Sequence, residues 1–224
     1  MKNDFINKSS QFKKSLIDNI KMQKEKQYEE NPDSLVLQFE CELKELGFEF
    51  EIFQQLIGFM PRHKEIILPR AIEYYREAKR RGKENEQNYF LSFFHFKGFE
   101  ELVPMLLDDF YSPETADLTQ WIIADCIYQI CSKVYIDDYI KIVSNGLYGT
   151  NRQMIILLLG KLKSEEAVQV LINLLEDETV RLQAICALGN YKREEFRPYF
   201  ERFENVNHSA WRKNAKSALK KLEN

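Results

Sequence analysis

The sequence predicts an all-α protein built from stacked antiparallel helix pairs. Its 224 residues include only 8 glycines and 6 prolines, whereas sheets joined by tight turns need many such residues. Apolar residues make up 44% of the chain, which is enough to bury a core. Apolar residues with helical spacing also recur along the chain at a nearly constant interval, which favours a repeat of helices over one irregular bundle.

Residues 1–85 form the first predicted region, a helical part that acts as a cap or contains divergent repeats. Its first 30 residues are rich in lysine, and Phe12, Leu16 and Ile20 predict an amphipathic helix with a narrow apolar face. Three more helices are predicted after it. One starts near Pro32, with Asp33 or Ser34 as its N-cap, and ends at Gly47; the others cover 49–59 and 63–81, and Gly82 ends the last.

Residues 86–224 form the second predicted region, a single continuous row of helix pairs. Each pair has a first helix and a second helix that returns antiparallel to it. The predicted first helices cover residues 115–132, 150–161, 179–189 and 208–222. The predicted second helices cover residues 99–110, 134–146, 164–178 and 194–205.

The first helices repeat in detail. Their last apolar residues lie 29, 29 and 31 residues apart, at Ile130, Leu159, Leu188 and Leu219. Four residues before these ends the chain has Cys126, Ile155, Ala184 and Ala215, and seven residues before the last three it has Arg152, Arg181 and Arg212. A helix of about 12 residues cannot bury its apolar face alone, so neighbouring pairs are expected to stack.

The stretch LLEDETVRLQAICALGNY resembles the short HEAT-like repeat, in the form found in phycobilin-lyase-type HEAT proteins. An acidic turn, then Val-Arg, Ala and Ala-Leu-Gly appear here as Asp177, Val180, Arg181, Ala184, Ala187, Leu188 and Gly189. The resemblance covers about residues 115–222 and, more weakly, 86–110. It implies an α-α superhelix, the HEAT-like solenoid, but no single activity, and nothing in the chain marks a bilin lyase.

The three repeated arginines, Arg152, Arg181 and Arg212, have two interpretations. They bind phosphates or carboxylates of a ligand, or they brace one repeat against the next. We favour the brace, because an arginine in the first turn of a helix can reach an acidic or carbonyl group in the adjoining turn. Asp177 lies where an acidic capping residue belongs and joins this set of predicted structural residues.

No motif that carries chemistry is found, so we predict no enzyme activity, no cofactor and no metal site. The chain lacks Cys-x-x-Cys pairs, His-x-x-x-His spacing, phosphate-binding glycine loops and nucleophile elbows. Cys41, Cys126, Cys131 and Cys186 are predicted to be buried thiols, with a redox or nucleophilic role as the alternative. In NYFLSFFHF, Phe90, Phe93 and Phe94 are predicted core residues, with a ligand groove at His95 as the alternative.

Charge is segregated between the two kinds of helix. The second helices sum to −12 and the first helices to +6. In HEAT-like solenoids the second helices usually line the concave surface, so the resemblance implies an acidic concave face that favours a basic partner. The alternative is that these charges only solvate the surface. The candidate partner-binding residues are Asp138, Lys141, Glu165, Glu166, Gln169, Asn173 and Arg202.

These observations favour a protein-interaction scaffold, such as an adaptor or immunity-type protein, that binds a protein or peptide. The alternative is a nucleic-acid-binding protein resembling the alkylpurine DNA glycosylases, which are all-helical and similar in length. Those enzymes need a basic groove with aromatic residues; Trp121, Tyr191 and Trp211 are available, but the second helices are acidic. With no leader sequence and no run of about 18 apolar residues, a cytoplasmic location is expected.

Overall fold

The computed structural model describes residues 31–223 of the chain. These residues contain eleven α-helices and no β-strand, which confirms the predicted all-α class. The amphipathic helix predicted within residues 1–30 lies outside the described residues. The chain divides into two compact units between Phe93 and Phe94, eight residues after the boundary placed from the sequence.

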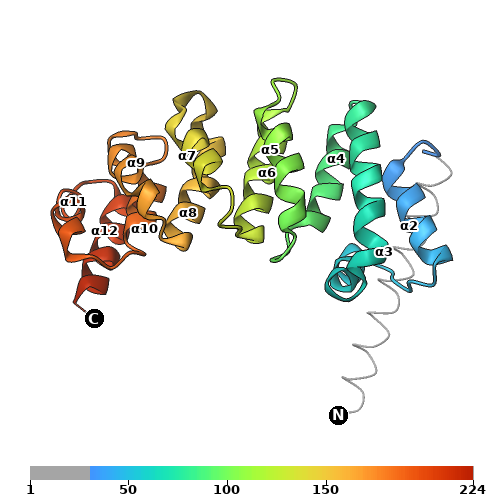
Figure 1. The fold of residues 1–224 in the computed structure, drawn as a ribbon, viewed down its shortest axis with the longest axis horizontal. Helices are drawn as coiled ribbons and strands as arrows, with labels where there is room; N and C mark the ends of the chain where they lie inside the picture. The colour runs from blue at the N-terminus through green and yellow to red at the C-terminus, as the bar shows by residue number, and fades with distance from the viewer. Residues whose placement is uncertain (1–30, 224) are drawn as a thin grey trace, which may run out of the picture. The chain divides into compact units, whose positions relative to one another are not determined.

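From residue 31 onward, the first unit contains three α-helices (Figure 1): α2 (Leu35–Glu45), α3 (Phe53–Arg80) and α4 (Glu84–Leu91). Ser34 is the N-cap of α2, and its side chain accepts a hydrogen bond from the Leu37 N–H. The two helices predicted over 49–59 and 63–81 meet within α3 at a kink, where His63 has non-helical backbone angles, so the predicted break between them is confirmed. Pro61 lies just before the kink and cannot donate a backbone hydrogen bond, which favours the break at this point.

Aromatic rings form the centre of this first unit. The Phe39 ring packs edge to face against Tyr74, Phe90 and Phe93, with centroid distances of 5.4, 5.3 and 5.1 Å. Phe90, Phe93 and Phe94 are completely buried, so the prediction that these residues belong to the core is confirmed.

The second unit contains the eight remaining α-helices. The first helices are α6 (Asp117–Ile130), α8 (Gln153–Leu162), α10 (Arg181–Leu188) and α12 (Ser209–Leu222), and each packs on the next in the row. The second helices are α5 (Val103–Tyr111), α7 (Ile136–Ser144), α9 (Val168–Asn173) and α11 (Arg197–Glu201). Figure 1 shows α7 beside α8, α9 beside α10 and α11 beside α12. Each second helix therefore packs against the first helix that follows it, whereas the sequence-based prediction paired each first helix with the second helix after it, 150–161 with 164–178 and 179–189 with 194–205.

The second helices are shorter than their sequence predicts. Short 3-10 segments precede α5, α9 and α11, and another follows α9, so residues 164–178 are not one regular helix. These segments are η2 (Glu100–Leu102), η4 (Glu165–Ala167), η6 (Glu194–Phe196) and η5 (Leu174–Glu176). The connection between α7 and α8 is a longer 3-10 segment, η3 (Gly146–Arg152).

The repeat register read from the sequence is confirmed by burial. All four helix-end residues, and all four residues one turn before them, are buried. The structure also explains the glycine that follows two of these ends. A Cβ atom on Gly160 would lie 2.4 Å from Ala187 Cα, and one on Gly189 would lie 3.0 Å from Ala218 Cβ. These glycines therefore let α8 approach α10, and α10 approach α12, almost backbone to backbone.

Candidate functional site

Arg152 is nearly completely buried, with 2% of its surface exposed, and its guanidinium donates to acceptors within the protein. Its Nη1 donates to the Val143 carbonyl at 2.7 Å, at the end of α7, and its Nε donates to the Gly149 carbonyl at 3.0 Å. Its Nη2 forms an ion pair with the Asp177 carboxylate, which lies in the next connection along the row. The guanidinium thus joins three segments of the chain.

Arg181 and Arg212 make the corresponding backbone contacts one and two repeats later. Arg181 donates to the carbonyls of Leu175, at 2.6 Å, and Glu176, at 3.1 Å, where η5 ends. Its guanidinium also lies 4.4 Å from the centroid of the Trp211 ring on α12. Arg212 donates to the Val206 carbonyl at 2.9 Å. Each arginine therefore links the end of one second helix to the start of the following first helix.

Asp177 does not cap α10, contrary to the sequence-based expectation. The N-cap of α10 is Val180, which has no side-chain oxygen. Asp177 instead accepts hydrogen bonds from the Thr179 N–H at 3.0 Å and the Thr179 hydroxyl at 2.6 Å, in addition to its ion pair with Arg152. Partial burial raises the pKa of this carboxyl, but the bonds from Thr179 and Arg152 outweigh burial and lower the pKa overall.

We expect Arg181→Ala to lower the free energy of unfolding by about 2 kcal/mol, because the carbonyl of the buried Leu175 loses its donor and the contact with the Trp211 ring is lost. The loss is measurable as a lower urea midpoint in tryptophan fluorescence. Both tryptophans, Trp121 and Trp211, lie in the second unit and report on it, and Arg181→Lys tests whether charge alone suffices. An unchanged midpoint for Arg181→Ala would rule out the bracing role.

The candidate partner-binding residues lie on or beside α7, α9 and α11, and many of their charged groups are paired. Lys141 donates to Asp138 at 3.1 Å on α7, and Gln169 donates to Asn173 at 3.0 Å on α9. Arg202 pairs with Glu176 at 2.6 Å, which joins α11 to the end of η5.

The two glutamates that begin η4 have different partners. Glu165 forms an ion pair with Arg193, whereas Glu166 accepts a hydrogen bond from the Ser164 hydroxyl at 2.7 Å, which lowers the pKa of its carboxyl. Lys141, Glu165 and Arg202 keep 69%, 63% and 48% of their side chains exposed. The structure thus places these residues at the surface, where ion pairs with neighbours are weak and exchange readily with a partner's charges.

A cysteine, a histidine and an aspartate meet beside α6, but not in a catalytic geometry. His95 Nε2 lies 3.1 Å from Asp125 Oδ2 and 3.5 Å from Cys126 Sγ, so one nitrogen contacts both groups. A relay would need the two nitrogens of the ring to contact different partners. Burial raises the pKa of the Cys126 thiol, which disfavours the nucleophilic thiolate.

The four cysteines are free thiols, and the prediction that all are buried is correct only for Cys126. Cys41, Cys131 and Cys186 are partly exposed. Cys131 follows the last residue of α6 in a left-handed conformation, with φ of 61°, and such a turn at a helix end faces solvent on one side. Within residues 31–223, no three His, Cys, Asp or Glu side chains are grouped to hold a metal ion.

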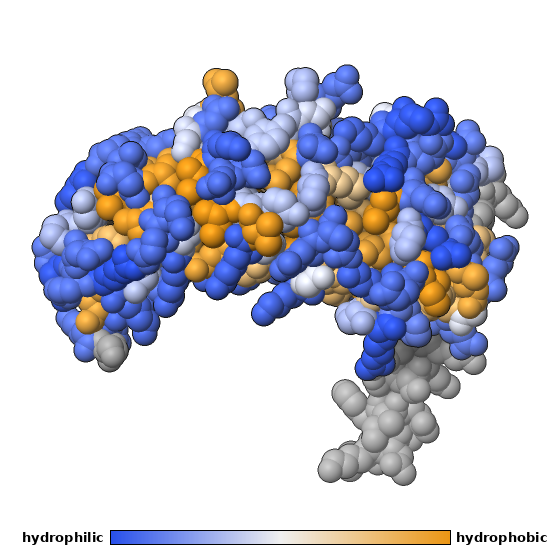
Figure 2. Space-filling model, viewed as in Figure 1, coloured by the Kyte–Doolittle hydropathy of each residue, from blue (hydrophilic) through white to orange (hydrophobic). Residues whose placement is uncertain are grey.

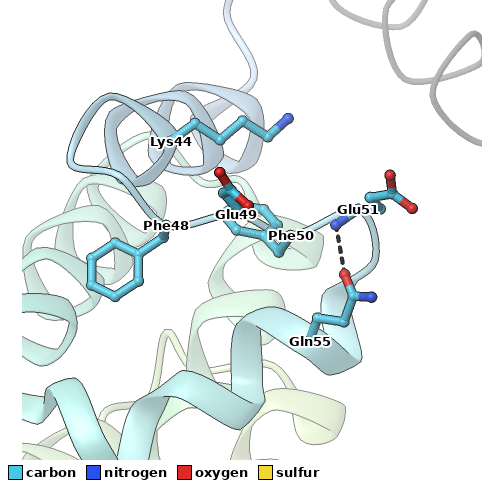
Figure 3. A pocket seen from close by; sticks show the side chains of 6 residues that line it. All are labelled: Lys44, Phe48, Glu49, Phe50, Glu51 and Gln55. Carbon is cyan, nitrogen blue, oxygen red and sulfur yellow. Dashed lines mark hydrogen bonds between the residues drawn. The ribbon is translucent and has the colours of Figure 1, made fainter.

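The first unit has an open depression of about 570 Å³ between the end of α2 and the start of α3. Figure 3 shows its lining side chains, from Lys44, Phe48, Glu49, Phe50, Glu51 and Gln55. The Glu51 N–H donates to Gln55 Oε1 at 2.7 Å, while the Glu51 carboxylate points away from the other side chains (Figure 3). These polar groups do not converge on one point, as groups that hold a substrate must.

None of the helices in the described part of the chain is long and apolar enough to span a membrane.

Comparisons with known proteins identify part of the second unit. No curated protein and no solved structure matches the chain. The family model for HEAT repeats matches residues 136–220, from the first residue of α7 to the last turn of α12. The stretch from 86 to 135, which includes α5 and α6, lies outside this match, and its assignment to the same repeats stays a prediction. Over residues 136–220 the chain therefore matches the HEAT repeats, whose helix pairs stack into an α-α solenoid.

Proposed function

We propose that the chain is a non-enzymatic protein-interaction scaffold that binds a basic protein or peptide on the surface of its second helices. HEAT repeats are typically scaffolds for protein interactions. The observation that carries the proposal is the acidic pair at the start of every second helix: Glu100–Glu101, Asp137–Asp138, Glu165–Glu166 and Glu194–Glu195. A repeated scaffold presents these pairs at regular intervals, as an extended basic segment would require.

Arginine and lysine neighbours offset only part of this charge. Arg193 serves both Glu165 and Glu195, and Arg197 pairs with Glu194 one turn away. The remaining excess of carboxylates repels a phosphate backbone, which disfavours the alternative of a nucleic-acid-binding protein. The lack of a nucleophile–base pair at His95 and of convergent groups at the α2–α3 depression supports a role without catalysis.

Charge reversal tests the proposal. We expect the triple variant Asp138→Lys, Glu165→Lys, Glu166→Lys to bind a lysine-rich peptide about tenfold more weakly than wild type at low salt. Fluorescence anisotropy of the labelled peptide measures the dissociation constant. The control variant Glu49→Lys, Glu51→Lys reverses two acids of the first unit and is expected to leave the affinity within about twofold.

Two outcomes would contradict the proposal. One is the absence of lysine-rich peptide binding by wild type at low salt. The other is a salt-sensitive gel shift of duplex DNA by wild type, which would favour the nucleic-acid alternative.

A further inference from the structure

The α5–α6 pair differs from the rest of the second unit in charge. From residue 98 to residue 132 the chain has seven acidic residues and no lysine or arginine. Each helix pair that follows contains basic residues, such as Lys141 on α7, Arg181 on α10 and Arg202 after α11. The α5–α6 pair contributes only acidic charge, and Asp125 pairs with His95, which lies before α5.

The same pair exposes large apolar side chains. Leu118 and Trp121, one turn apart at the start of α6, are 60% and 37% exposed, and Tyr111 at the end of α5 is 39% exposed. Figure 2 shows apolar surface gathered in the region of α6 and α8. A soluble protein rarely leaves neighbouring large apolar side chains uncovered without a binding role.

The connection between α7 and α8 adds a fourth exposed apolar side chain to this neighbourhood. Arg181 and Arg212 each donate to a carbonyl six residues earlier, whereas Arg152 reaches Val143, nine residues earlier. Arg152 thus reaches back across the whole connection to the end of α7, although this repeat has the same 29-residue length as the next one. Leu147, within this connection, is 94% exposed.

Hydrogen bonds and ring contacts hold the connection between α7 and α8 against α5 and α6. The Tyr148 ring packs against Phe110 with a centroid distance of 5.0 Å and lies 6.4 Å from Tyr111. Asn151 Nδ2 donates to Gln120 Oε1 at 2.7 Å and to Asp117 Oδ1 at 3.4 Å, at the start of α6. Tyr148 and Asn151 both follow Leu147 and contact the α5–α6 pair, so this part of the connection lies beside that pair.

We propose that Tyr111, Leu118, Trp121 and Leu147 form a docking surface for an amphipathic segment of a partner protein. Its apolar side chains would cover these four residues, and its lysines or arginines would meet acids of the same pair, such as Glu114 and Asp117. Charge complementarity selects this occupant, because a segment with acidic flanks would be repelled. This inference rests on the proposed function, and it places the main apolar contact on α5–α6, outside the residues selected from the sequence.

The test uses an amphipathic helical peptide of lysine and leucine as its probe. We expect the full chain with Leu118→Ser and Leu147→Ser to bind it about tenfold more weakly than wild type, because exposed apolar anchors dominate such contacts. Val134→Ser is the matched control: Val134 is 73% exposed and lies before α7, and its change is expected to leave the affinity within about twofold. Thermal melts of all variants are expected to match wild type, since the changed side chains are exposed.

A second measurement follows the surface itself. In a Trp211→Phe background the only tryptophan is Trp121, and we expect its emission to shift to the blue when the lysine–leucine peptide binds. A peptide of the same composition in scrambled order, and one of glutamate and leucine, are expected to give no shift. A shift with the scrambled peptide equal to that with the amphipathic one would overturn the amphipathic occupant.

The outcomes separate this inference from the proposed function. Peptide binding that is weakened by Glu165→Lys and Glu166→Lys, but unchanged by Leu118→Ser and Leu147→Ser, would overturn the α5–α6 surface and leave the scaffold proposal standing. Failure of wild type to bind any cationic peptide would overturn both. Binding of duplex DNA that Leu118→Ser and Leu147→Ser do not affect would also contradict both.

Discussion

Replacing Gly160 with alanine is expected to lower the free energy of unfolding by about 3 kcal/mol, because the new methyl group collides with the neighbouring helix. A Cβ atom at this position would lie 2.4 Å from Ala187 Cα, 2.6 Å from Ala187 Cβ and 2.8 Å from the Ala187 carbonyl oxygen. Two of these three atoms belong to the backbone of α10, so no side-chain rotation relieves the contact. The helices α8 and α10 must move apart, and the buried side chains between them lose contacts.

Two other glycines make this prediction a graded series. At Gly189 the nearest atom to an added Cβ is Ala218 Cβ at 3.0 Å, so Gly189→Ala is expected to cost about 1 kcal/mol. Gly58 lies inside α3 with nothing within 4 Å of an added Cβ, so Gly58→Ala is expected to stabilise the chain by about 0.5–1 kcal/mol through helix propensity.

Urea unfolding followed by tryptophan fluorescence measures the two changes in the second unit, and circular dichroism measures the change at Gly58. Equal stability of the Gly160→Ala and Gly189→Ala variants would show that the row of first helices adjusts its spacing freely. Close packing between repeats would then not be the reason why glycine is needed at positions 160 and 189.

Much of the fold follows from short-range patterns in the sequence, and the exceptions have specific physical causes. Helical spacing placed the eight helices of the second unit, and the repeat offsets placed buried residues such as Ile155 and Ala184. The break predicted between 49–59 and 63–81 is present as the kink at His63, beside Pro61, which cannot donate a backbone hydrogen bond. The predicted second helices were too long, because the 3-10 turns beside them have almost the same apolar spacing as an α-helix.

The surface was harder to predict from the sequence than the core. The summed charge of each predicted helix showed that the second helices are acidic. It did not show that Arg193 and Arg202 pair with acids on neighbouring elements. The exposure of Leu147 and Trp121 depends on tertiary packing, because the same residues in a buried helix would give the same pattern.

Replacing Arg152 with methionine is expected to lower the free energy of unfolding by about 3 kcal/mol, which is more than the loss expected at Arg181. Methionine keeps an unbranched apolar stem but removes the guanidinium, and with it the donors to the Val143 and Gly149 carbonyls and to Asp177. Arg152 is 2% exposed, so water cannot replace all of these donors, and unpaired buried acceptors are costly. Urea unfolding of the second unit measures the loss; a change below about 1 kcal/mol would contradict it.

The ion pair between Arg152 and Asp177 also gives this brace a defined pH dependence. The folded state lowers the Asp177 pKa, so its contribution to stability is fully present above the ordinary carboxyl pKa of about 4 and is lost as the pH falls through the lowered value. The stability difference between wild type and Asp177→Asn is therefore expected to shrink on acidification. In the Arg152→Met background the same difference starts smaller but does not vanish, because Thr179 still donates to Asp177. Equal pH dependence in the two backgrounds would show that Thr179 alone lowers the pKa. In that case the bond from Arg152 would stabilise the protein by linking two repeats, and its charge would not contribute to the lowered Asp177 pKa.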